Sequence, residues 1–360
     1  MEIRLLLNIT ALDIGGANTK AVSLKIIDGL IYLDSTYSTY FPIWAEGKEN
    51  LGNQLKTCIN SLSSPADLVA ITMTAELSDV YNDKREGVLH ILNSVGKAFE
   101  DVETLVLTNE YDLVSPEQVY FDPLKVAGAN WVATAWLASK IIKNCIVVDV
   151  GSTTTDIIPV INHQIVAKGK NDLERLQSGE LIYTGALRTN LATMVNKAPI
   201  NDTLTRVSSE IFSTTGDIHL ILGNISSSDY NIDTSDGRGK SLEESYSRLA
   251  RLVCSDVETI NQKTLKNLAG FLYEKQIDLI ASGINQINNR ISHNSDETYP
   301  VLSLGFGRKF LGARAAANLD LNVQYLENLC NLPANVPETV IGLGWFAASK
   351  KEKVVPQWMQ

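Results

Sequence analysis

Two short stretches of the chain combine an aspartate, a glycine turn and small polar residues. The first runs from Ala11 to Lys20 and the second from Ile146 to Ile158. In each, an apolar run ends in Asp, a Gly follows two residues later, and the chain then becomes apolar again, as expected for strand, turn and strand. Glycine permits the backbone geometry of such a turn. Its successive N–H groups can form an anion-binding hollow, so both stretches are candidate phosphate loops.

The residues around each turn add further ligands for phosphate and metal. Asp13 and Asp149 end the two apolar runs and can hold hydrated Mg²⁺. Lys20 can serve as a cation directed at phosphate. Either turn alone is typical of an ordinary hairpin, but the repetition favours paired phosphate loops and two domains of similar topology. The phosphate-binding candidates in the two turns are Gly15, Gly16, Asn18, Thr19, Gly151, Ser152, Thr153 and Thr154.

Three other positions could face a ligand. Gly305 and Gly307 lie between a buried strand and a helix, where backbone and helix N-terminus favour a flat or anionic group. Glu76 follows the apolar strand 68–73 and is either a metal or substrate contact or a solvated acid. The segment 183–190 carries hydroxyls and an arginine beside a glycine. It is either a loop facing a ligand or a β-turn with a surface Arg188.

Composition narrows the class of protein. The chain has 360 residues, enough for two domains, and its 44% hydrophobic and 20% charged residues are ordinary for a globular protein. A net charge of -10 argues against nucleic-acid binding. Four cysteines without a Cys-x-x-Cys pair indicate neither zinc nor disulfides and favour a reducing cytoplasm. The sequence contains no apolar run of about 20 residues, so no membrane span is expected. The apolar run within residues 1–7 is not followed by a signal-peptide cleavage site.

The remaining chain predicts alternating strands and helices. Apolar residues at helical spacing and strand-like runs define these elements, and the polar stretch 226–240 is expected to be a surface loop. A small-residue helix at 341–348 is expected to return to the first domain. Strands are predicted at 21–33, 36–40, 68–73 and 103–107, and helices at 49–62, 84–99, 123–143, 242–253, 256–268 and 269–290.

The three glycine signals, in this order, resemble the acetate and sugar kinase, Hsp70 and actin superfamily. There they are the two phosphate loops and the nucleoside-binding loop. Within it, residues 11–20, 147–156 and 183–185 are similar to the hydantoinase/oxoprolinase branch. The resemblance implies an α/β fold with two ribonuclease H-like (actin/Hsp70-type) domains flanking a cleft. The expected domains are 1–145, with residues 1–10 as an extension, 146–335, and a C-terminal helix at 336–360 that returns to the first.

Three further motifs, at 212–219, 234–238 and 247–251, are similar to one small subgroup. Its members belong to tetrahydromethanopterin-linked C1 metabolism and methanofuran-type coenzyme synthesis. The resemblance implies an ether-forming transferase that joins an aminomethylfuran-methyl diphosphate to the phenol of γ-glutamyltyramine. The loops would then hold the diphosphate leaving group with Mg²⁺, which stabilises the charge that builds up on it.

The resemblance also implies roles for individual residues. Asp13 and Asp149 would hold Mg²⁺ through water, and Lys20 would face phosphate. Asp156 would either orient those waters or act as base toward the phenol. Glycines 305 and 307 would belong to the phosphate-binding set. The expected substrate contacts are Glu76, Tyr183, Thr184, Arg188, Asp236 and Arg238.

Two other function classes stay open at this point. One is an ATP-dependent small-molecule kinase or a hydantoinase/oxoprolinase-type hydrolase, which the Gly305–Gly307 turn favours through its fit to a nucleotide. The other is a nucleotide-gated binding protein, in which ATP or ADP would be the partner. The chain lacks the long extra domain that a chaperone needs for its client. No motif indicates an oligomer seam.

Overall fold

A computed structural model describes residues 7–292, 298–333 and 336–359, so most of the predicted extension at 1–10 lies outside it. The chain divides into two compact units. Unit 1 comprises the described residues of Met1–Asn144, Val160–Arg175 and Tyr325–Gln360, and unit 2 comprises Cys145–Pro159 and Leu176–Gln324. This division differs from the predicted domain bounds because residues 160–175 and 325–335 group with unit 1.

The hairpin at 160–165 shows why part of that region joins unit 1. The backbone N–H of His163 donates to the carbonyl of Lys143, at 2.9 Å. Its ring Nδ1 lies 2.8 Å from the carbonyl oxygen of Ser139. The N–H of Asn162 donates to the side chain of Asn144. The hairpin is therefore held by the end of the preceding helix.

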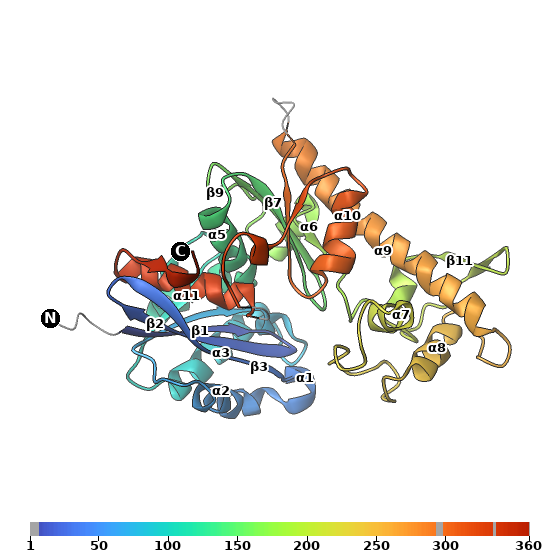
Figure 1. The fold of residues 1–360 in the computed structure, drawn as a ribbon. Helices are drawn as coiled ribbons and strands as arrows, with labels where there is room; N and C mark the ends of the chain where they lie inside the picture. The colour runs from blue at the N-terminus through green and yellow to red at the C-terminus, as the bar shows by residue number, and fades with distance from the viewer. Residues whose placement is uncertain (1–6, 293–297, 334–335, 360) are drawn as a thin grey trace. The chain divides into compact units, whose positions relative to one another are not determined.

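Unit 1 is built on a mixed sheet whose strand order is β15-β3-β2-β1-β4-β5-β6 (Figure 1). β1 to β3 form an antiparallel meander, and β4 and β5 continue the sheet parallel to β1. The strands are β1 (Leu7–Ile14), β2 (Asn18–Ile27), β3 (Leu30–Tyr40), β4 (Leu68–Met73), β5 (Glu103–Leu107), β6 (Leu113–Val114) and β15 (Val355–Pro356), with β9 (Gln164–Ile165) in the hairpin.

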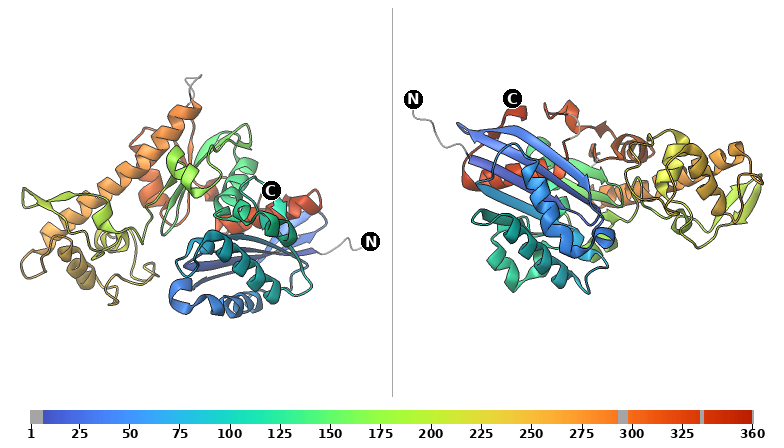
Figure 2. Two further views of the ribbon diagram at one scale, coloured as in Figure 1. Left: turned by 180° about the vertical axis from the view of Figure 1, so that it is seen from behind. Right: turned by 90° about the horizontal axis from the view of Figure 1, so that it is seen from below.

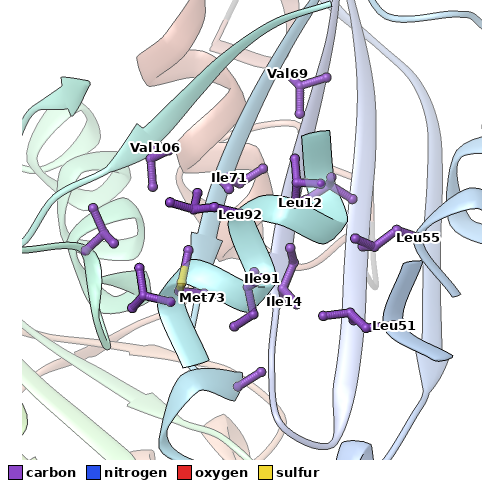
Figure 3. Close-up of a cluster of buried hydrophobic side chains, with 14 of the residues drawn as sticks. Leu12, Ile14, Leu51, Leu55, Val69, Ile71, Met73, Ile91, Leu92 and Val106 are labelled. Atoms are coloured by element: carbon purple, nitrogen blue, oxygen red, sulfur yellow. The ribbon is translucent and has the colours of Figure 1, made fainter. Parts of the chain in front are cut away.

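One face of this sheet is covered by α2 and α3. Leu12 and Ile14 of β1 meet Leu55 of α2 and Ile91 of α3 in a fully buried apolar cluster, shown in Figure 3. Each such side chain contributes about 1.5–3 kcal/mol when buried. Asp83 caps α3 by accepting from the N–H of Glu86. The helices of unit 1 are α1 (Ile43–Glu46), α2 (Leu51–Asn60), α3 (Lys84–Ala98), α4 (Pro116–Phe121), α5 (Asn130–Ile141), the start of α6 (Asp172–Ser178) and α11 (Glu338–Lys351).

The opposite face is covered by α11, which also packs on α5 (Figure 2). Two glycines make this contact close. A β-carbon on Gly342 would collide with the backbone of Ala133, and one on Gly344 would lie 2.6 Å from Leu24 and 3.4 Å from Ala11. The predicted return of the C-terminal helix to the first domain is therefore found in unit 1.

Unit 2 contains a second sheet, of order β10-β8-β7-β13-β14. With strands numbered from β7, this is the order 3-2-1-4-5, and β3-β2-β1-β4-β5 of unit 1 repeats it. In both sheets the fourth strand lies parallel to the first. The strands are β7 (Cys145–Val150), β8 (Thr155–Ile161), β10 (Leu181–Ile182), β13 (Val301–Leu304) and β14 (Val323–Gln324).

A helical part of unit 2 gathers around the long helix α9 (Gln262–Ile291), visible in Figure 1. Buried side chains of α7 and α8 pack on its N-terminal half, together with a two-stranded ribbon. Its C-terminal half packs on the sheet, where Gly283 meets Ile157 and Ile182. The other elements are α7 (Thr215–Leu222), α8 (Leu242–Arg251), α10 (Ala313–Ala317), β11 (Lys197–Ile200) and β12 (Thr203–Arg206).

Two helix predictions were wrong. The helix expected at 123–143 is broken, because Gly128 has φ +61° and separates a short 3₁₀ turn at Pro123–Val126 from α5. The helices expected at 256–268 and 269–290 are one element, α9. It begins after Asn261, whose side chain accepts from the N–H of Thr264, and it continues through Gly270 without interruption.

Candidate functional site

The first predicted turn joins β1 to β2 in unit 1. The N–H of Gly15 donates to the carbonyl of Asn18 at 2.9 Å, which closes the turn. Asp13 is the next-to-last residue of β1 and is 6% exposed. Lys20 is its register partner on β2, and its Nζ lies 3.9 Å from a carboxylate oxygen of Asp13. A cation and an anion therefore stand side by side at the mouth of this turn, while Thr19 is fully buried.

The first turn is packed closely from behind. A β-carbon on Gly15 would lie 2.8 Å from the carbonyl oxygen of Asn18, so only glycine fits there. Gly16 lies against the short 3₁₀ turn Ala75–Leu77 and accepts from the N–H of Ile43 at 2.9 Å. These contacts fix the turn at the end of β1, beside the end of the parallel strand β4.

The second predicted turn joins β7 to β8 in unit 2 and has the same closure. The N–H of Gly151 donates to the carbonyl of Thr154, again at 2.9 Å. Asp149 lies two residues before that glycine, as Asp13 lies before Gly15. Both turns connect the first and second strands of sheets with the same order. The repetition seen in the sequence is thus a repetition of local structure inside each unit.

The segment 184–188 lies directly behind the second turn. The N–H of Ala186 donates to the carbonyl of Gly151 at 2.9 Å, and the N–H groups of Leu187 and Arg188 donate to that of Ser152. A β-carbon on Gly185 would lie 2.5 Å from the backbone nitrogen of Thr153. Only glycine allows this approach, so the two backbones form one rigid layer.

The late glycine turn also reaches the second turn. The N–H of Gly307 donates to the carbonyl of Val150 at 2.9 Å. Gly305 has φ +78°, and a β-carbon there would collide with the carboxylate of Asp149. Phe306 between them is 39% exposed. Three stretches predicted separately from the sequence therefore meet inside unit 2.

Behind this layer lies a buried polar network. Thr184 is 1% exposed, and its hydroxyl lies 3.1 Å from that of Thr189 and 3.0 Å from Nε2 of Gln276. Gln276 in turn contacts the ring of His219 at 3.0 Å. Complete burial lowers the pKa of His219 to about 3, so the ring is neutral near pH 7. The Thr184 hydroxyl, expected at the substrate, is engaged with protein.

A second buried network holds the loop 226–240. Arg248 is fully buried and pairs with Asp217 at 2.7 Å and Asp236 at 3.2 Å. Arg251 also pairs with Asp236, at 3.0 Å. Burial alone would raise the pKa of Asp236, but the amide of Arg238 and the two guanidinium groups hold it below its usual range. Arg238 itself remains exposed.

Glu76 lies in unit 1 and is only 1% exposed. Neither carboxylate oxygen has a hydrogen-bond partner of good geometry. Burial raises its pKa to about 7, and the negative charge of Asp172 adds to this. Its own amide, that of Gly128 and the ammonium of Lys84 offset only part of the effect. Glu76 is therefore a buried carboxylic acid rather than a solvated one.

The structure thus places the predicted residues in two groups. Around the first turn in unit 1 lie Asp13, Gly15, Gly16, Asn18, Thr19 and Lys20, with Glu76 on the neighbouring 3₁₀ turn. The second group lies in unit 2, where the second turn meets Thr184, Arg188, Gly305 and Gly307. Asp156 on β8, 9% exposed, and Tyr183, 62% exposed, also belong to unit 2. Asp236 and Arg238 lie elsewhere in unit 2, in the loop held by α8.

Sequence reasoning missed the residues that support these turns. Gln276, His219 and Arg248 are fully buried polar side chains. Gln276 had a signal, because it stands between Leu272 and Ile280 on the apolar stripe of α9, where a polar residue requires a buried partner. His219 stands among apolar residues of α7, and only its neighbours in space reveal its role.

The metal predicted from the sequence can be tested against these residues. In the described ranges, no three His, Cys, Asp or Glu side chains form a ready metal cage. Asp13 in unit 1 and Asp149 in unit 2 each carry a carboxylate, the kind of oxygen ligand that Mg²⁺ prefers, and Mg²⁺ commonly keeps several waters and binds through one or two carboxylates and substrate phosphates. Each carboxylate by itself is a suitable Mg²⁺ ligand of that kind.

The repeated sheet order defines the class of this protein: it has the α/β fold of the acetate and sugar kinase, Hsp70 and actin superfamily. A nucleotide-free acetone carboxylase structure agrees with this fold, at a TM-score of 0.53 and 10% identity over 94% of this chain and 70% of that one. Residues 67–332 match the family model described as hydantoinase/oxoprolinase. The chain belongs to the hydantoinase/oxoprolinase family.

Two curated relatives share one description, (4-{4-[2-(gamma-L-glutamylamino)ethyl]phenoxymethyl}furan-2-yl)methanamine synthase. The protein from Methanocaldococcus jannaschii is 38% identical over 304 residues, covering 84% of this chain and 87% of the relative. The protein from Methanococcus vannielii is 43% identical over 155 residues, covering 43% of this chain and 69% of the relative. Among the helices of the described residues, none has the length and apolarity needed to cross a membrane.

Proposed function

We propose that this protein is an ether-forming transferase of methanofuran-type coenzyme synthesis. It joins an aminomethylfuran-methyl diphosphate to the phenol of γ-glutamyltyramine and releases diphosphate. The observation that carries this proposal is the 38% identity, over 84% of the chain, to a synthase named for a product that contains that phenoxymethyl-furan ether. The reaction would take place in the cytoplasm, where the four cysteines stay reduced.

The chemistry requires a good leaving group and a proton acceptor. The phenol oxygen forms a bond to the furan methylene as the bond from that carbon to the diphosphate oxygen breaks. The phenol proton goes to a base, and the electron pair leaves with diphosphate. The furan ring can share the positive charge that develops on the methylene.

Each of the two Asp–Gly turns would be a phosphate-binding element of its own unit. Their N–H groups and the charge of Lys20 suit an anion, and Asp13 and Asp149 would hold Mg²⁺ through water. Mg²⁺ supplies stabilisation of the negative charge on the departing diphosphate. Asp156 on β8, beside the second turn, would either orient the waters or accept the phenol proton. Tyr183 and Arg238, which are exposed, and the half-buried Arg188 would contact the acceptor.

The proposal is tested by incubating the purified protein with Mg²⁺, the furan diphosphate and γ-glutamyltyramine. Diphosphate is measured by a coupled assay and the ether by mass spectrometry, and we expect the two products in equal amounts. Asp149→Asn should lower the rate strongly, whereas Asp278→Asn, on the exposed side of α9, should leave it unchanged. ADP formation from ATP without ether formation would instead support a kinase or hydrolase, and would refute the transferase.

A further inference from the structure

A chain of side chains runs from the half-buried Asn224, just after α7, through buried residues of α7 and α9 to the backbone behind the second turn. Nδ2 of Asn224 lies 3.1 Å from Nδ1 of His219. Nε2 of His219 lies 3.0 Å from Oε1 of Gln276. Nε2 of Gln276 then lies 3.0 Å from the hydroxyl of Thr184 and 2.8 Å from the carbonyl oxygen of Gly185. His219 and Gln276 are both fully buried.

The carbonyl of Gly185, at the end of this chain, determines the direction of every hydrogen bond in it. The carbonyl of Gly185 can only accept, so the amide nitrogen of Gln276 must face it and donate. The amide oxygen of Gln276 then faces His219 and accepts from its Nε2–H. The neutral ring therefore has no proton on Nδ1, which accepts from Asn224. One arrangement of protons satisfies all four residues.

The groups that accept from Gln276 belong to Thr184 and Gly185, in the backbone segment that supports the second turn. The N–H groups of Ala186, Leu187 and Arg188 donate to the carbonyls of Gly151 and Ser152. Gly185 itself touches Thr153. The carbonyl of Gly185 also accepts from the hydroxyl of Thr215 at 2.9 Å. Gln276 is therefore the link between the core of the helical part and the peptide units on which the turn lies.

We propose that Gln276, with His219 and Asn224 behind it, is a positioning residue for the turn Gly151–Thr154. By holding the Thr184–Arg188 backbone, Gln276 sets the direction in which the N–H groups of the turn point, and so the affinity of the turn for diphosphate. The functional part of this inference rests on the proposed function, because it requires that the turn bind diphosphate. Gln276 cannot touch a substrate, since it is enclosed by protein.

Two substitutions at this position separate its donor role from its acceptor role. Gln276→Met keeps nearly the same volume and removes both functions. Gln276→Glu keeps an acceptor for His219 but places a carboxylate against the carbonyl of Gly185. Thr264→Val is the matched control, because Thr264 is a buried polar residue of the same helix, bonded to Asn201 at 2.9 Å. Asn224→Ala removes only the far end of the chain, and we expect a smaller effect in the same direction.

Two measurements test the proposal, and one of them is independent of the transferase reaction. Amide hydrogen exchange at Ala186, Leu187 and Arg188 should become about 10-fold faster in both Gln276 variants and stay unchanged in Thr264→Val. The Kd for inorganic diphosphate with Mg²⁺, measured by calorimetry, should rise about 10-fold in the same variants. In the full reaction, the KM for the furan diphosphate should rise more than kcat falls.

The outcomes are distinguishable. Unchanged exchange at 186–188 in both Gln276 variants overturns the positioning role. Wild-type exchange in Gln276→Glu at a pH where the new carboxyl is ionised and cannot donate, with faster exchange in Gln276→Met, overturns the donor role assigned to its amide nitrogen. If exchange becomes faster in the variants but the wild-type protein binds no diphosphate, the proposed function fails, while the hold of Gln276 on the backbone stands. Should Gln276→Met not fold, Asn224→Ala gives the same exchange readout.

Discussion

Replacing Glu76 by Gln should stabilise the protein at neutral pH and have little effect in acid. Glu76 is 1% exposed, and its two oxygens lack hydrogen-bond partners of good geometry. Burial raises its pKa from 4.5 to about 7. The folded protein therefore binds this proton more tightly than the unfolded chain does. The resulting stability is fully present below pH 4.5, and it is lost as the pH rises through about 7.

The size of the effect follows from the two pKa values. They differ by about 2.5, and each pKa unit corresponds to about 1.36 kcal/mol of free energy. The wild-type protein should thus lose about 3 kcal/mol of unfolding free energy between acid and pH 8 through this residue alone. Glu76→Gln has no such proton to release. The difference in stability between variant and wild type should therefore grow by about 3 kcal/mol over that range.

The assay is urea unfolding at pH 4.5, 6 and 8, followed by circular dichroism, with the midpoint and slope fitted at each pH. Other titrating groups contribute equally to both proteins and cancel in the difference. Glu274→Gln, on the exposed side of α9, is the control for the substitution itself and should change the free energy of unfolding by less than about 0.5 kcal/mol. A constant difference between Glu76→Gln and wild type across the three pH values would refute the reasoning.

Three further predictions concern unit 2. Arg248→Met should lower the free energy of unfolding in urea by about 3–5 kcal/mol, because it leaves Asp217 charged and buried. Adding Asp217→Asn should recover part of that loss, and equal stability of the single and double variants would contradict this. Gly185→Ala should lower the Tm and weaken diphosphate binding, since its β-carbon would lie 2.5 Å from Thr153, and an unchanged Tm would show that the backbone can yield. Diphosphate with Mg²⁺ should raise the Tm of the wild-type protein but not the Tm of Asp149→Asn. Equal rises in the two proteins would disprove this prediction.

Sequence reasoning was most effective where a residue type is dictated by the backbone. At Gly15 a β-carbon would lie 2.8 Å from the carbonyl oxygen of Asn18. Gly15 and Gly151 close their turns through the same backbone hydrogen bond, from their N–H to the carbonyl three residues later, and an aspartate stands two residues before each. That repetition predicted two domains of similar topology, and the family resemblance implied the α/β fold. The sheet orders of the two units agree with it strand by strand.

The parts that failed depend on contacts distant in sequence. Gln276 and Thr184 are 92 residues apart, so no local pattern joins them. Arg248 meets Asp217 across 31 residues, and only the packing of α8 on α7 reveals the pair. The broken helix at Gly128 carried a local signal, since glycine favours φ > 0, but its alanine-rich surroundings suggested continuity.

The return of α11 to unit 1 has a consequence for how the chain is made. The face of the first sheet that receives Gly344 cannot be covered until α11, which ends at Lys351, has left the ribosome. Domains generally fold in order of synthesis. Here β1 to β3 must wait for α11, which is made after all of unit 2, so a nascent chain exposes an apolar surface that chaperones would recognise. A stop codon placed before Glu338 should therefore yield an aggregating product rather than a shorter enzyme.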